Sequence, residues 1–336
     1  MRRILVTGAT SMIGTALIKK LIENGDKIVA VVRENCTKLS KLPNSQLIEV
    51  IACNMDEYWK LTDKIEGTID VAFATAWNGT RGSSRNDQVL QGENLKYNKD
   101  LLHAVIDLGC KVFITSGSQA EYGVWNESCK LSEDVVPNPN TEYGKHKLAF
   151  YEYAEKYCCE CGCRLVEPRF FSLYGPYDFD GTLVMSMLKK LMNNETCDLT
   201  KCIQQWDFLY IDDAVDALKL LIDISECSGI YNFGSGYSAP LRKFVEIMAE
   251  ITQSSSMLNY GAIPYPKTGI VNVNPNVQKL LSIGWQPKVS FEMGIKEIIK
   301  NMNGEIVPKI NEGGVKRSFI LICQCGCTHS TMRCAA

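Results

Sequence analysis

The chain has 336 residues, enough for one large domain or two modest ones with a sizeable core. Apolar residues make up 46%, charged residues 22%, and the formal net charge is −2, which argues against a nucleic-acid or membrane-surface partner. No apolar run approaches the roughly 20 residues of a membrane helix. The first residues run directly into a predicted strand and leave no room for a signal peptide, so we expect a cytoplasmic globular protein.

The 15 cysteines are an unusual feature. An odd number of cysteines without an export signal favours free thiols in a reducing compartment. In the run CCECGC at 158–163, Cys158 and Cys161 have the spacing of a zinc site, but small thiols at the end of a helix can simply pack. We therefore predict no metal there. For the cysteines of the C-terminal tail, binding of a soft metal or oxidation stays open.

The first half of the chain alternates between short β-branched runs and helical patterns at 12–24 and 89–108. The predicted strands are RILVTG, KIVAVVR, QLIEVIA, IDVAFAT and CKVFITS, and CRLVEPRFF is a sixth, after a helix at 142–160. Strands that alternate with helices indicate βαβ units. We predict an α/β fold with a doubly wound, Rossmann-like parallel sheet.

Beyond Tyr174 the predicted helices are separated by loops rich in glycine and proline, and they span 182–192, 211–223, 240–251 and 291–301. This change predicts a smaller, mixed C-terminal lobe that binds substrate. The predicted organisation is an NAD(P)-binding Rossmann domain over 1–173, with segments near 207–235 returning to it, a substrate lobe over 174–206 and 236–308, and a poorly ordered cysteine-rich tail over 309–336.

The stretch ILVTGATSMIGTALIKKLIENG predicts a strand, a tight turn and a helix. Gly8, Ser11 and Gly14 have the spacing of a dinucleotide-binding turn, although a glycine is commoner at the place of Ser11. Gly8 permits the sharp turn, Gly14 permits close packing of helix on strand, and the helix N-terminus offers N–H groups to a pyrophosphate.

The second strand ends in VVRE, where NAD-binding proteins usually place an acid that binds the ribose 2′-hydroxyl. Arg33 takes that place and could meet a 2′-phosphate, whereas Glu34 follows and could act as the acid. We favour NADP and keep NAD as the alternative.

Tyr143 and Lys147 lie one helical turn apart in EYGKHKLAFYEYAEKY and share a helix face. A neighbouring ammonium favours a phenolate and lowers the tyrosine pKa toward neutrality. Such pairs are also common on solvated helix faces. The upstream stretch VFITSGSQAEYG predicts a strand that ends in a hydroxyl-rich loop at the carboxyl edge of the same sheet, where ligands bind.

These motifs resemble those of the extended short-chain dehydrogenases/reductases, also called the NAD-dependent epimerase/dehydratase family. The resemblance covers roughly residues 3–303 and is carried by VTGATSMIG, DVAFATAW, ENLKYNKDLLHA, FITSGSQAEYG, YGKHK, PRFFSLYGP, WDFLYIDDAVDAL, YNFGSG and LLSIGWQPKVSFEMGIKEII. It implies that Ser118 polarises the substrate carbonyl, Tyr143 transfers the proton, and Lys147 holds the nicotinamide ribose and tunes Tyr143.

The resemblance also implies a cofactor-binding set: Gly8, Thr10, Ser11, Met12, Ile13, Gly14, Arg33, Asn54, Met55, Ala76, Asn94, Ser116, Tyr143 and Lys147. Asn94 is also open to a purely helix-stabilising polar contact. The family implies a homodimer in which the helices at about 89–108 and 142–160 form a four-helix bundle.

In this family, the residues after the catalytic hydroxyl distinguish enzymes that catalyse different reactions. Its 4,6-dehydratases carry an Asp-Glu or similar pair after the catalytic hydroxyl, but Gln119 and Ala120 stand here and Glu121 is one place too far along. We therefore set dehydration aside. A 4-epimerase keeps NAD bound and usually has an acid on the second strand, whereas Arg33 favours net reduction by NADPH.

The second lobe and the GSQAEYG loop resemble reductases of nucleotide-linked 4-keto-6-deoxyhexoses, the group typified by CDP-abequose synthase. Candidate substrate-binding residues are Gln119, Ser172, Trp206 and Lys267. Trp206 replaces an arginine that contacts the sugar diphosphate in many relatives, and Ser172 replaces an asparagine. Lys267 and Arg242 are candidate replacements for the missing charge, and packing is the alternative role for Trp206.

The sequence therefore predicts an NAD(P)H-dependent reductase in nucleotide-sugar and surface-polysaccharide biosynthesis, with a nucleotide-sugar substrate. The alternatives are a nucleotide-sugar 4-epimerase of the UDP-glucose 4-epimerase type with tightly bound NAD, and a non-catalytic regulator that senses NADP. Retention of Ser118, Tyr143 and Lys147 argues against the regulator.

Overall fold

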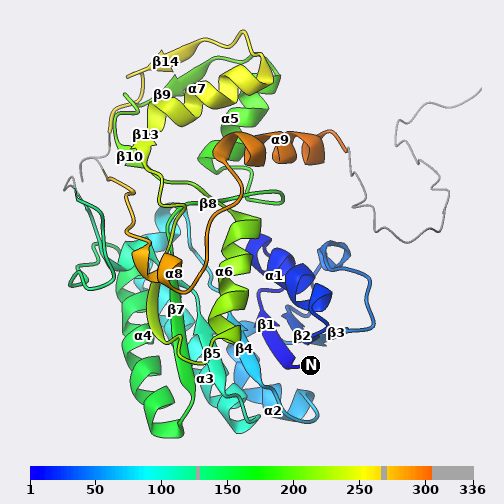
Figure 1. Cartoon of the computed structure of the whole chain (residues 1–336). Coiled ribbons are helices and arrows are strands. Elements are labelled where there is room, and N and C mark those ends of the chain that lie inside the picture. Colours follow the sequence, from blue (N-terminus) through cyan, green and yellow to red (C-terminus); the bar gives the residue numbers. More distant parts are fainter. Residues whose placement is uncertain (126–128, 266–270, 305–336) are drawn as a thin grey trace, which may run out of the picture.

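The structure, a computed structural model, describes residues 1–125, 129–265 and 271–304 (Figure 1). Lys267 and the whole predicted tail lie outside these residues, so the predictions made for them are not addressed by the structure. Figure 1 shows a lower part built around a sheet and an upper part that carries α5, α7 and α9.

The lower part is an eight-stranded sheet whose main path runs β12-β7-β5-β4-β1-β2-β3. Its strands are β1 (Arg3–Thr7), β2 (Lys27–Val32), β3 (Ile48–Ala52), β4 (Val71–Ala74), β5 (Val112–Thr115), β6 (Gly117–Ser118), β7 (Arg164–Phe170) and β12 (Gly229–Phe233). Every pairing in it is parallel, with β6 beside β7. The predicted doubly wound fold is thereby confirmed, and β12 adds a strand that the sequence analysis did not name.

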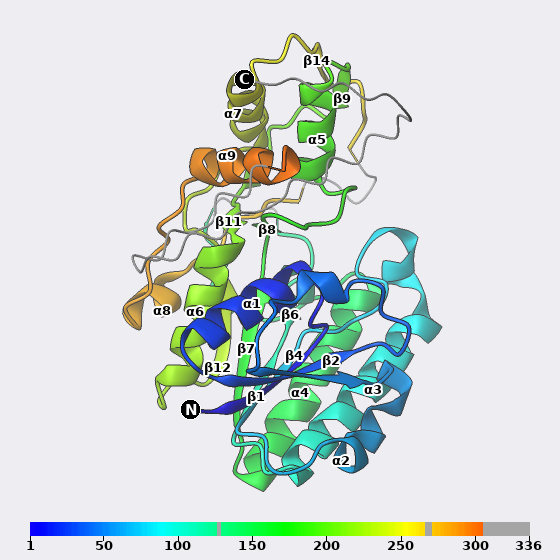
Figure 2. The same cartoon turned by 90° about the vertical axis from the view of Figure 1, so that its right-hand side faces the viewer.

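Helices cover both faces of the sheet because its central strands are apolar on both sides. α1 (Met12–Glu23) and α6 (Ile211–Asp223) pack together on one face. The other face carries α2 (Leu61–Lys64), α3 (Gln88–Asp107) and α4 (Glu142–Cys161) (Figure 2). Helices α1, α3, α4 and α6 begin and end close to the predicted bounds, whereas α2 was not predicted.

Short 3₁₀ turns lie in the connections of this part. They are η1 (Leu39–Lys41), η2 (Met55–Lys60), η3 (Gly82–Asn86) and η4 (Gln119–Glu121). η3 and η4 follow β4 and β6 and lie at the carboxyl edge of the sheet, where the predicted catalytic residues are.

The upper part is built from helices and two-stranded pairings. Its helices are α5 (Leu183–Met192), α7 (Leu241–Thr252) and α9 (Phe291–Met302), and α8 (Gln278–Ser282) lies nearer the sheet. Its strand pairs are β9 (Cys197–Leu199) with β14 (Leu258–Tyr260), β10 (Gln205–Trp206) with β13 (Ala239–Pro240), and β8 (Leu173–Tyr174) with β11 (Leu209–Tyr210). The division into a Rossmann domain and a substrate lobe stays a prediction, and the return of β12 and α6 to the sheet is consistent with it.

Aromatic side chains join the small strand pairs to the helices of the upper part. The Phe208 ring lies 5.1 Å from Phe244 and 5.1 Å from Phe291, and Tyr174 lies 5.2 Å from Phe291. Edge and tilted contacts of this kind stabilise a core beyond the area that they bury. These contacts fix the start of the loop that follows Tyr174. That loop faces the sheet edge.

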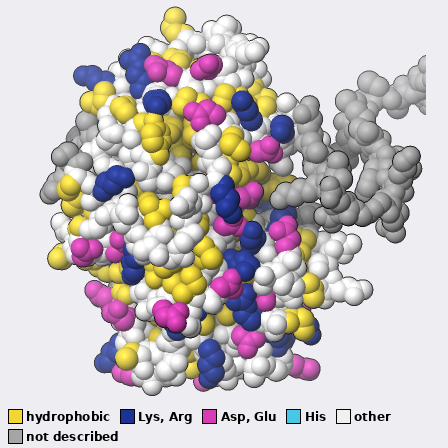
Figure 3. All heavy atoms as spheres, viewed as in Figure 1, with side chains coloured by type: hydrophobic (Ala, Val, Ile, Leu, Met, Phe, Trp, Pro, Cys, Tyr) yellow, Lys and Arg dark blue, Asp and Glu magenta, His cyan; other side chains and the backbone are white. Residues whose placement is uncertain are grey.

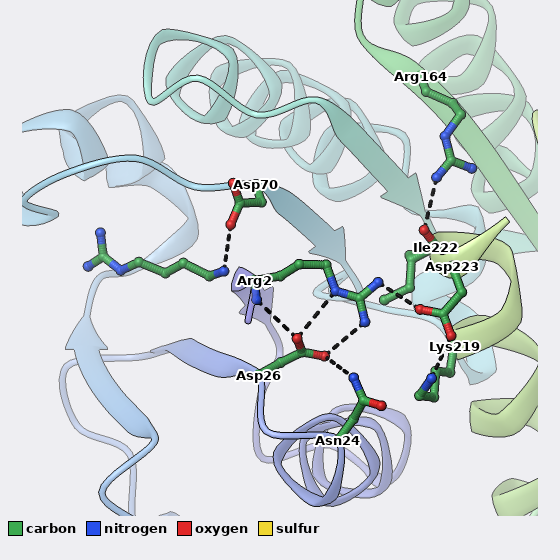
Figure 4. Close-up of polar contacts among 9 residues, drawn as sticks. Arg2, Asn24, Asp26, Asp70, Arg164, Lys219, Ile222 and Asp223 are labelled. Carbon is green, nitrogen blue, oxygen red and sulfur yellow. Dashed lines mark hydrogen bonds and ion pairs between the residues drawn. The ribbon is translucent and has the colours of Figure 1, made fainter. Parts of the chain in front are cut away.

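An ion cluster closes the amino end of the sheet (Figure 4). The Arg2 side chain donates to Asp26 Oδ2 at 2.9 Å and to Asp223 Oδ1 at 2.7 Å. Arg2 therefore joins β1, the turn before β2 and the end of α6. The burial of Asp26 raises its pKa, but the hydrogen bonds from Arg2 and Asn24 outweigh it, and the net pKa is lowered.

The surface shows acidic and basic side chains interspersed over the face of Figure 3, without a large field of one sign. This agrees with the small net charge. Within the described residues, no helix combines the length and apolarity that crossing a membrane requires. The buried cysteines among those residues are free thiols, and no three potential ligands there gather to hold a metal ion.

Candidate active site

A cavity of about 500 Å³ opens at the carboxyl edge of the sheet, over the ends of β1, β2 and β4. The strand order reverses between β1 and β4, and ligands of open α/β sheets bind at such a switch point. The predicted cofactor residues that line it are Gly8, Thr10, Ser11, Arg33, Asn54, Met55 and Ala76. The cavity is large enough for a dinucleotide half and belongs to the site predicted from the sequence.

In the glycine turn the backbone lies close to neighbouring segments, as the positions of Gly8 and Gly14 predicted. Gly8 adopts φ +62°, and a Cβ there would lie 2.9 Å from Thr75 Oγ1. A Cβ on Gly14 would lie 2.9 Å from Ala9 Cα, so only glycine lets the helix pack this closely. Ser11 caps the helix, because its Oγ accepts the Gly14 N–H at 3.0 Å. This turn leaves free N–H groups at the cavity, and Met12 and Ile13 begin the helix behind it.

Arg33 and Lys38 both line the cavity beyond the end of β2. Arg33 is exposed, and Glu34 is not among the lining residues. The Glu34 backbone N–H instead donates to Asn54 Oδ1 at 3.2 Å. The side of the cavity where an adenosine ribose would lie therefore presents two cations.

Ser118 and Tyr143 meet at this edge. The Ser118 side chain is close enough to the phenol to oppose the rise in the Tyr143 pKa that burial causes. Tyr143 is buried at the start of α4, whose N-cap Thr141 accepts the Gly144 N–H at 3.1 Å. The serine and the tyrosine are therefore within reach of one substrate oxygen, as acid–base chemistry requires.

The predicted tuning of Tyr143 by Lys147 differs from what the structure shows. Burial raises the pKa of Tyr143, and the groups that lower it are Ser118 and then Arg85, whose guanidinium lies 4.6 Å from the phenol ring centroid. Lys147 Nζ is 5.9 Å from that centroid and donates to the Ser116 carbonyl at 2.6 Å. Burial also lowers the pKa of Lys147 to about 7, which weakens its action as a cation.

Trp77, which the sequence analysis did not single out, lies between the cavity and the catalytic pair. Its ring centroid is 3.9 Å from Lys147 Nζ and 6.3 Å from the Tyr143 ring, and its Nε1 donates to Gln91 Oε1 at 2.7 Å. Trp77 follows Ala76 at the end of DVAFATAW. Its position directly after the β4 strand end was the available signal.

Asn94 is fully buried in α3 and binds the loop after β4. Its Nδ2 donates to the Asn78 carbonyl at 2.9 Å, and its Oδ1 accepts the Asn78 N–H at 3.0 Å. The amide therefore holds the loop that carries Trp77. Ser116 Oγ donates to the Ala74 carbonyl at 3.0 Å and contacts Lys147 Nζ at 3.1 Å. Direct cofactor contacts for Asn94 and Ser116 stay predictions.

The predicted substrate residues are scattered more widely. Gln119 and Ser172 are half-buried beside η4 and β8. Trp206 packs 6.2 Å from the Phe208 ring, which agrees with the packing alternative. Arg242 lies over Tyr260 and pairs with Glu246 at 2.8 Å, so its charge is already engaged.

Two arginines that the sequence analysis missed lie over the site. Arg85, at half-buried η3, covers the Tyr143 ring. Arg81 pairs with buried Asp178 at 3.2 Å and lies over the Phe179 ring at 4.9 Å. Both come from the loop NGTRGSSRND after β4. Arg81 also lines a second cavity of about 580 Å³, together with Lys38, Lys41 and Tyr177.

A buried charge cluster lies beneath the catalytic loop. Glu121 Oε1 accepts the Ser118 N–H at 2.7 Å, and its other oxygen is 3.1 Å from Arg169 Nε. Arg169 Nε also donates to Glu167 Oε1 at 2.8 Å. Burial raises the pKa of both carboxyls, that of Glu167 well above its usual range. Glu121 therefore points away from the substrate side, as its place in the sequence predicted.

The comparisons with known proteins show the family and the fold. The model of the NAD dependent epimerase/dehydratase family matches residues 4–234. CDP-abequose synthase of Salmonella muenchen is 29% identical over 303 residues, with 89% of this chain and 97% of the relative covered.

Solved structures share the fold. UDP-glucose 4-epimerase of Thermotoga maritima, solved with UDP-glucose, superposes with a TM-score of 0.80 at 23% identity and covers 91% of this chain and 100% of its own. RMD of Pseudomonas aeruginosa, complexed with NADPH, gives a TM-score of 0.77 at 20% identity over 91% and 100% of the two chains. With the family model over most of the sheet and the glycine turn, tyrosine and lysine in place, this chain belongs to the NAD-dependent epimerase/dehydratase family.

Proposed function

We propose that the chain is an NADPH-dependent reductase of a nucleotide-linked 4-keto-6-deoxyhexose. The observation that carries this is the proximity of Ser118 to Tyr143 at the carboxyl edge of the sheet, beside a cavity lined by the glycine turn. It is supported by the similarity to CDP-abequose synthase over nearly the whole chain. A place in surface-polysaccharide biosynthesis and a cytoplasmic location stay predictions.

The chain's own residues supply the proton chemistry. A nicotinamide bound in the cavity would supply hydride to C4 of the sugar, which turns the ketone into an alkoxide while NADPH becomes NADP⁺. Tyr143 gives its proton to that oxygen, and the Ser118 hydroxyl donates a hydrogen bond to it as charge develops. Because burial raises the Tyr143 pKa, the phenol stays protonated at neutral pH, which suits a proton donor.

The cofactor preference is proposed from Arg33 and Lys38. Two cations beside the adenosine end favour a 2′-phosphate, whereas an acid there would favour the 2′-hydroxyl of NAD. Both line the cavity and Glu34 does not. The experiment is to replace each of Arg33 and Lys38 by Ala, and we expect about a tenfold rise in KM for NADPH with little change for NADH. An unchanged NADPH preference would contradict this assignment.

Arg85 and Arg81 are the proposed contacts for the substrate diphosphate, in place of the arginine that Trp206 replaces. Arg85 faces the catalytic phenol, and Arg81 bridges to the loop after β8. Arginine binds phosphate oxygens in bidentate geometry. Gln119 and Ser172 remain proposed sugar contacts.

The alternative function is a nucleotide-sugar 4-epimerase. It is retained because the fold is similar to that of a UDP-glucose 4-epimerase. An epimerase oxidises and re-reduces one carbon, so it holds its nicotinamide bound. The discriminating experiment follows NADPH and NADH oxidation with a panel of CDP-, dTDP- and GDP-linked 4-keto-6-deoxy sugars, with NMR of the products. Interconversion of the C4 epimers of a nucleotide sugar that carries a C4 hydroxyl, without added coenzyme and by protein purified with NAD, would favour the epimerase.

We also propose that the chain forms a homodimer through α3 and α4. The two helices pack together and carry an aromatic cluster, with His103 hydrogen-bonded to Tyr153 at 2.6 Å and Tyr153 stacked on Tyr157. A mass measurement by light scattering tests this, with a Tyr153→Glu variant expected to shift the protein to monomer. A monomeric unmutated chain would refute it.

A further inference from the structure

The buried cluster beneath the catalytic loop has no role in the chemistry described so far. Glu121, Glu167 and Arg169 are each at most 1% exposed. Removing three charged groups from water is costly unless they are paired. Such a cluster is a poor source of stability, so its position beside the catalytic residues asks for another explanation.

The cluster touches the catalytic machinery at two points. Glu121 and Ser118 form a reciprocal cap of η4, in which Ser118 Oγ accepts the Ala120 N–H at 3.2 Å and Glu121 accepts the Ser118 N–H. The second point is Lys147, which is 4% exposed and has Glu121, then Glu167, as the carboxyls that favour its charged form. The cluster therefore acts on the serine through geometry and on the lysine through charge.

We propose that Glu121 is a positioning residue for the proposed reaction, which fixes the Ser118 loop through the Ser118 N–H and supplies the buried negative charge that keeps Lys147 an ammonium. Arg169 Nε lies 3.1 Å from Glu121 Oε2 and 2.8 Å from Glu167 Oε1, and so holds the two carboxyls in place. The proposal rests on the proposed function, because Ser118 and Lys147 matter only if catalysis occurs.

The charge balance around Lys147 gives the sign of the pH effect. The titratable and charged groups on the elements packed around it are Tyr143 and Tyr151 of α4, Arg85 of η3, Glu121 of η4, and Glu167 and Arg169 of β7. Burial lowers the pKa of Lys147 to about 7, and Glu121 opposes this. Without the Glu121 charge, Lys147 loses its proton at lower pH.

The test uses Glu121→Gln, because the glutamine oxygen still accepts the Ser118 N–H while the charge is gone. We expect the high-pH limb of kcat/KM, and the high-pH loss of NADPH affinity, to move down by about one pH unit. The control is Glu152→Gln, an exposed site on α4, which should move neither limb. A purely structural Glu121 would lower the melting temperature and leave both pH profiles where they are, and that result would overturn the proposal.

Glu121→Asp separates the two roles and serves if Glu121→Gln does not fold. The charge is kept but the side chain is one carbon shorter, so we expect kcat to fall while the high-pH limb stays within a few tenths of a unit of the unmutated protein. A limb that shifts in Glu121→Asp would contradict the proposal. NADPH affinity, measured by nucleotide fluorescence, needs no substrate. If the unmutated chain binds NADPH but reduces no keto sugar, the proposed function fails. The pH dependence of NADPH affinity in Glu121→Gln then still decides whether Glu121 acts on Lys147.

Discussion

Two ion clusters lie at opposite ends of the same parallel sheet, and they differ in solvent access. At the amino end, Arg2 and Asp223 keep 25% and 32% of their side-chain surface exposed. At the carboxyl end, Glu121 and Arg169 have 0% and 1%. The first cluster ties strands and helix ends together, whereas the second lies against the catalytic loop and Lys147.

This difference separates charges that hold the fold from charges that serve the site. Half-exposed ion pairs contribute about 1 kcal/mol or less. A fully buried group costs desolvation and is rarely the most stable solution. The two ends also differ in protonation, because the pKa of Asp26 is lowered and that of Glu167 is raised. Variants at the two ends should therefore differ in which property they change and in the sign of their pH dependence.

Of the variants considered, Tyr143→Phe is expected to change activity most, and to change activity alone. Loss of the proton donor should lower kcat by about 10²–10⁴-fold, the usual contribution of a general acid. NADPH affinity should stay within a few fold, since the phenol oxygen lies outside the residues lining the cavity. Tyr157→Phe on the same helix is the control. A Tyr143→Phe enzyme with near-normal kcat would mean that another group donates the proton.

Arg169→Met is expected to give the largest loss of stability. It leaves Glu121 and Glu167 buried without their cation, and breaking a buried pair in this way costs about 3–5 kcal/mol. Urea unfolding measures it. The matched change at the other end, Arg2→Met, leaves one buried carboxylate, Asp26 at 2% exposed, without its cation, against two at the carboxyl end, so it should cost less. Equal losses at the two ends would remove the distinction drawn here.

Glu167→Gln tests the sign of the pH dependence of stability at the buried cluster. Because the folded pKa of Glu167 is raised, its contribution to stability is fully present below the unfolded value of about 4.3 and is lost as pH rises through the folded pKa. The variant has no such loss, so its stability relative to the unmutated chain should grow by up to about 1.4 kcal/mol per pH unit above that value. Denaturant unfolding at a series of pH values measures the slope; a slope of zero means that Glu167 is ionised in the folded chain.

Asp26→Asn tests the opposite pH dependence of stability, at the amino end of the sheet. It should give the smallest change in the free energy of unfolding. The lowered pKa means that Asp26 contributes stability above its unfolded value of about 3.9 and loses it as pH falls through the folded value. We expect a loss of about 1 kcal/mol at neutral pH that disappears in acid, with kcat unchanged. A change in kcat would show that the amino end is coupled to the site.

The sequence predicted those parts of the molecule that local patterns determine. The strands, the long helices and the glycine turn follow from apolar periodicity and from the need for Gly8 at positive φ. The sequence also placed Ser118 and Tyr143 at the same edge, because loops gather at the carboxyl edge of a parallel sheet, and their catalytic roles stay predictions.

What the sequence did not predict depends on contacts between distant segments. The pKa of Tyr143 is set by its burial and by Arg85, more than 50 residues away in the chain. Lys147 was expected to be the tuning cation, but its pKa depends on Glu121 and Glu167 from two other elements. Arg81 was missed because no local pattern marks a residue that completes a site from a loop, whereas the place of Trp77 after the β4 strand end was a signal that was not used.

The most direct test of the proposed function follows a deuterium label from the cofactor to the sugar. The purified chain is mixed with NADPH deuterated at the transferred position and with a CDP-linked 4-keto-6-deoxyhexose, and the product is analysed by NMR. A reductase places deuterium at C4 and consumes one NADPH per product molecule. An enzyme that leaves the keto sugar and the NADPH unchanged, but interconverts the C4 epimers of a nucleotide sugar with a C4 hydroxyl without incorporating deuterium, would contradict the account and would be an epimerase.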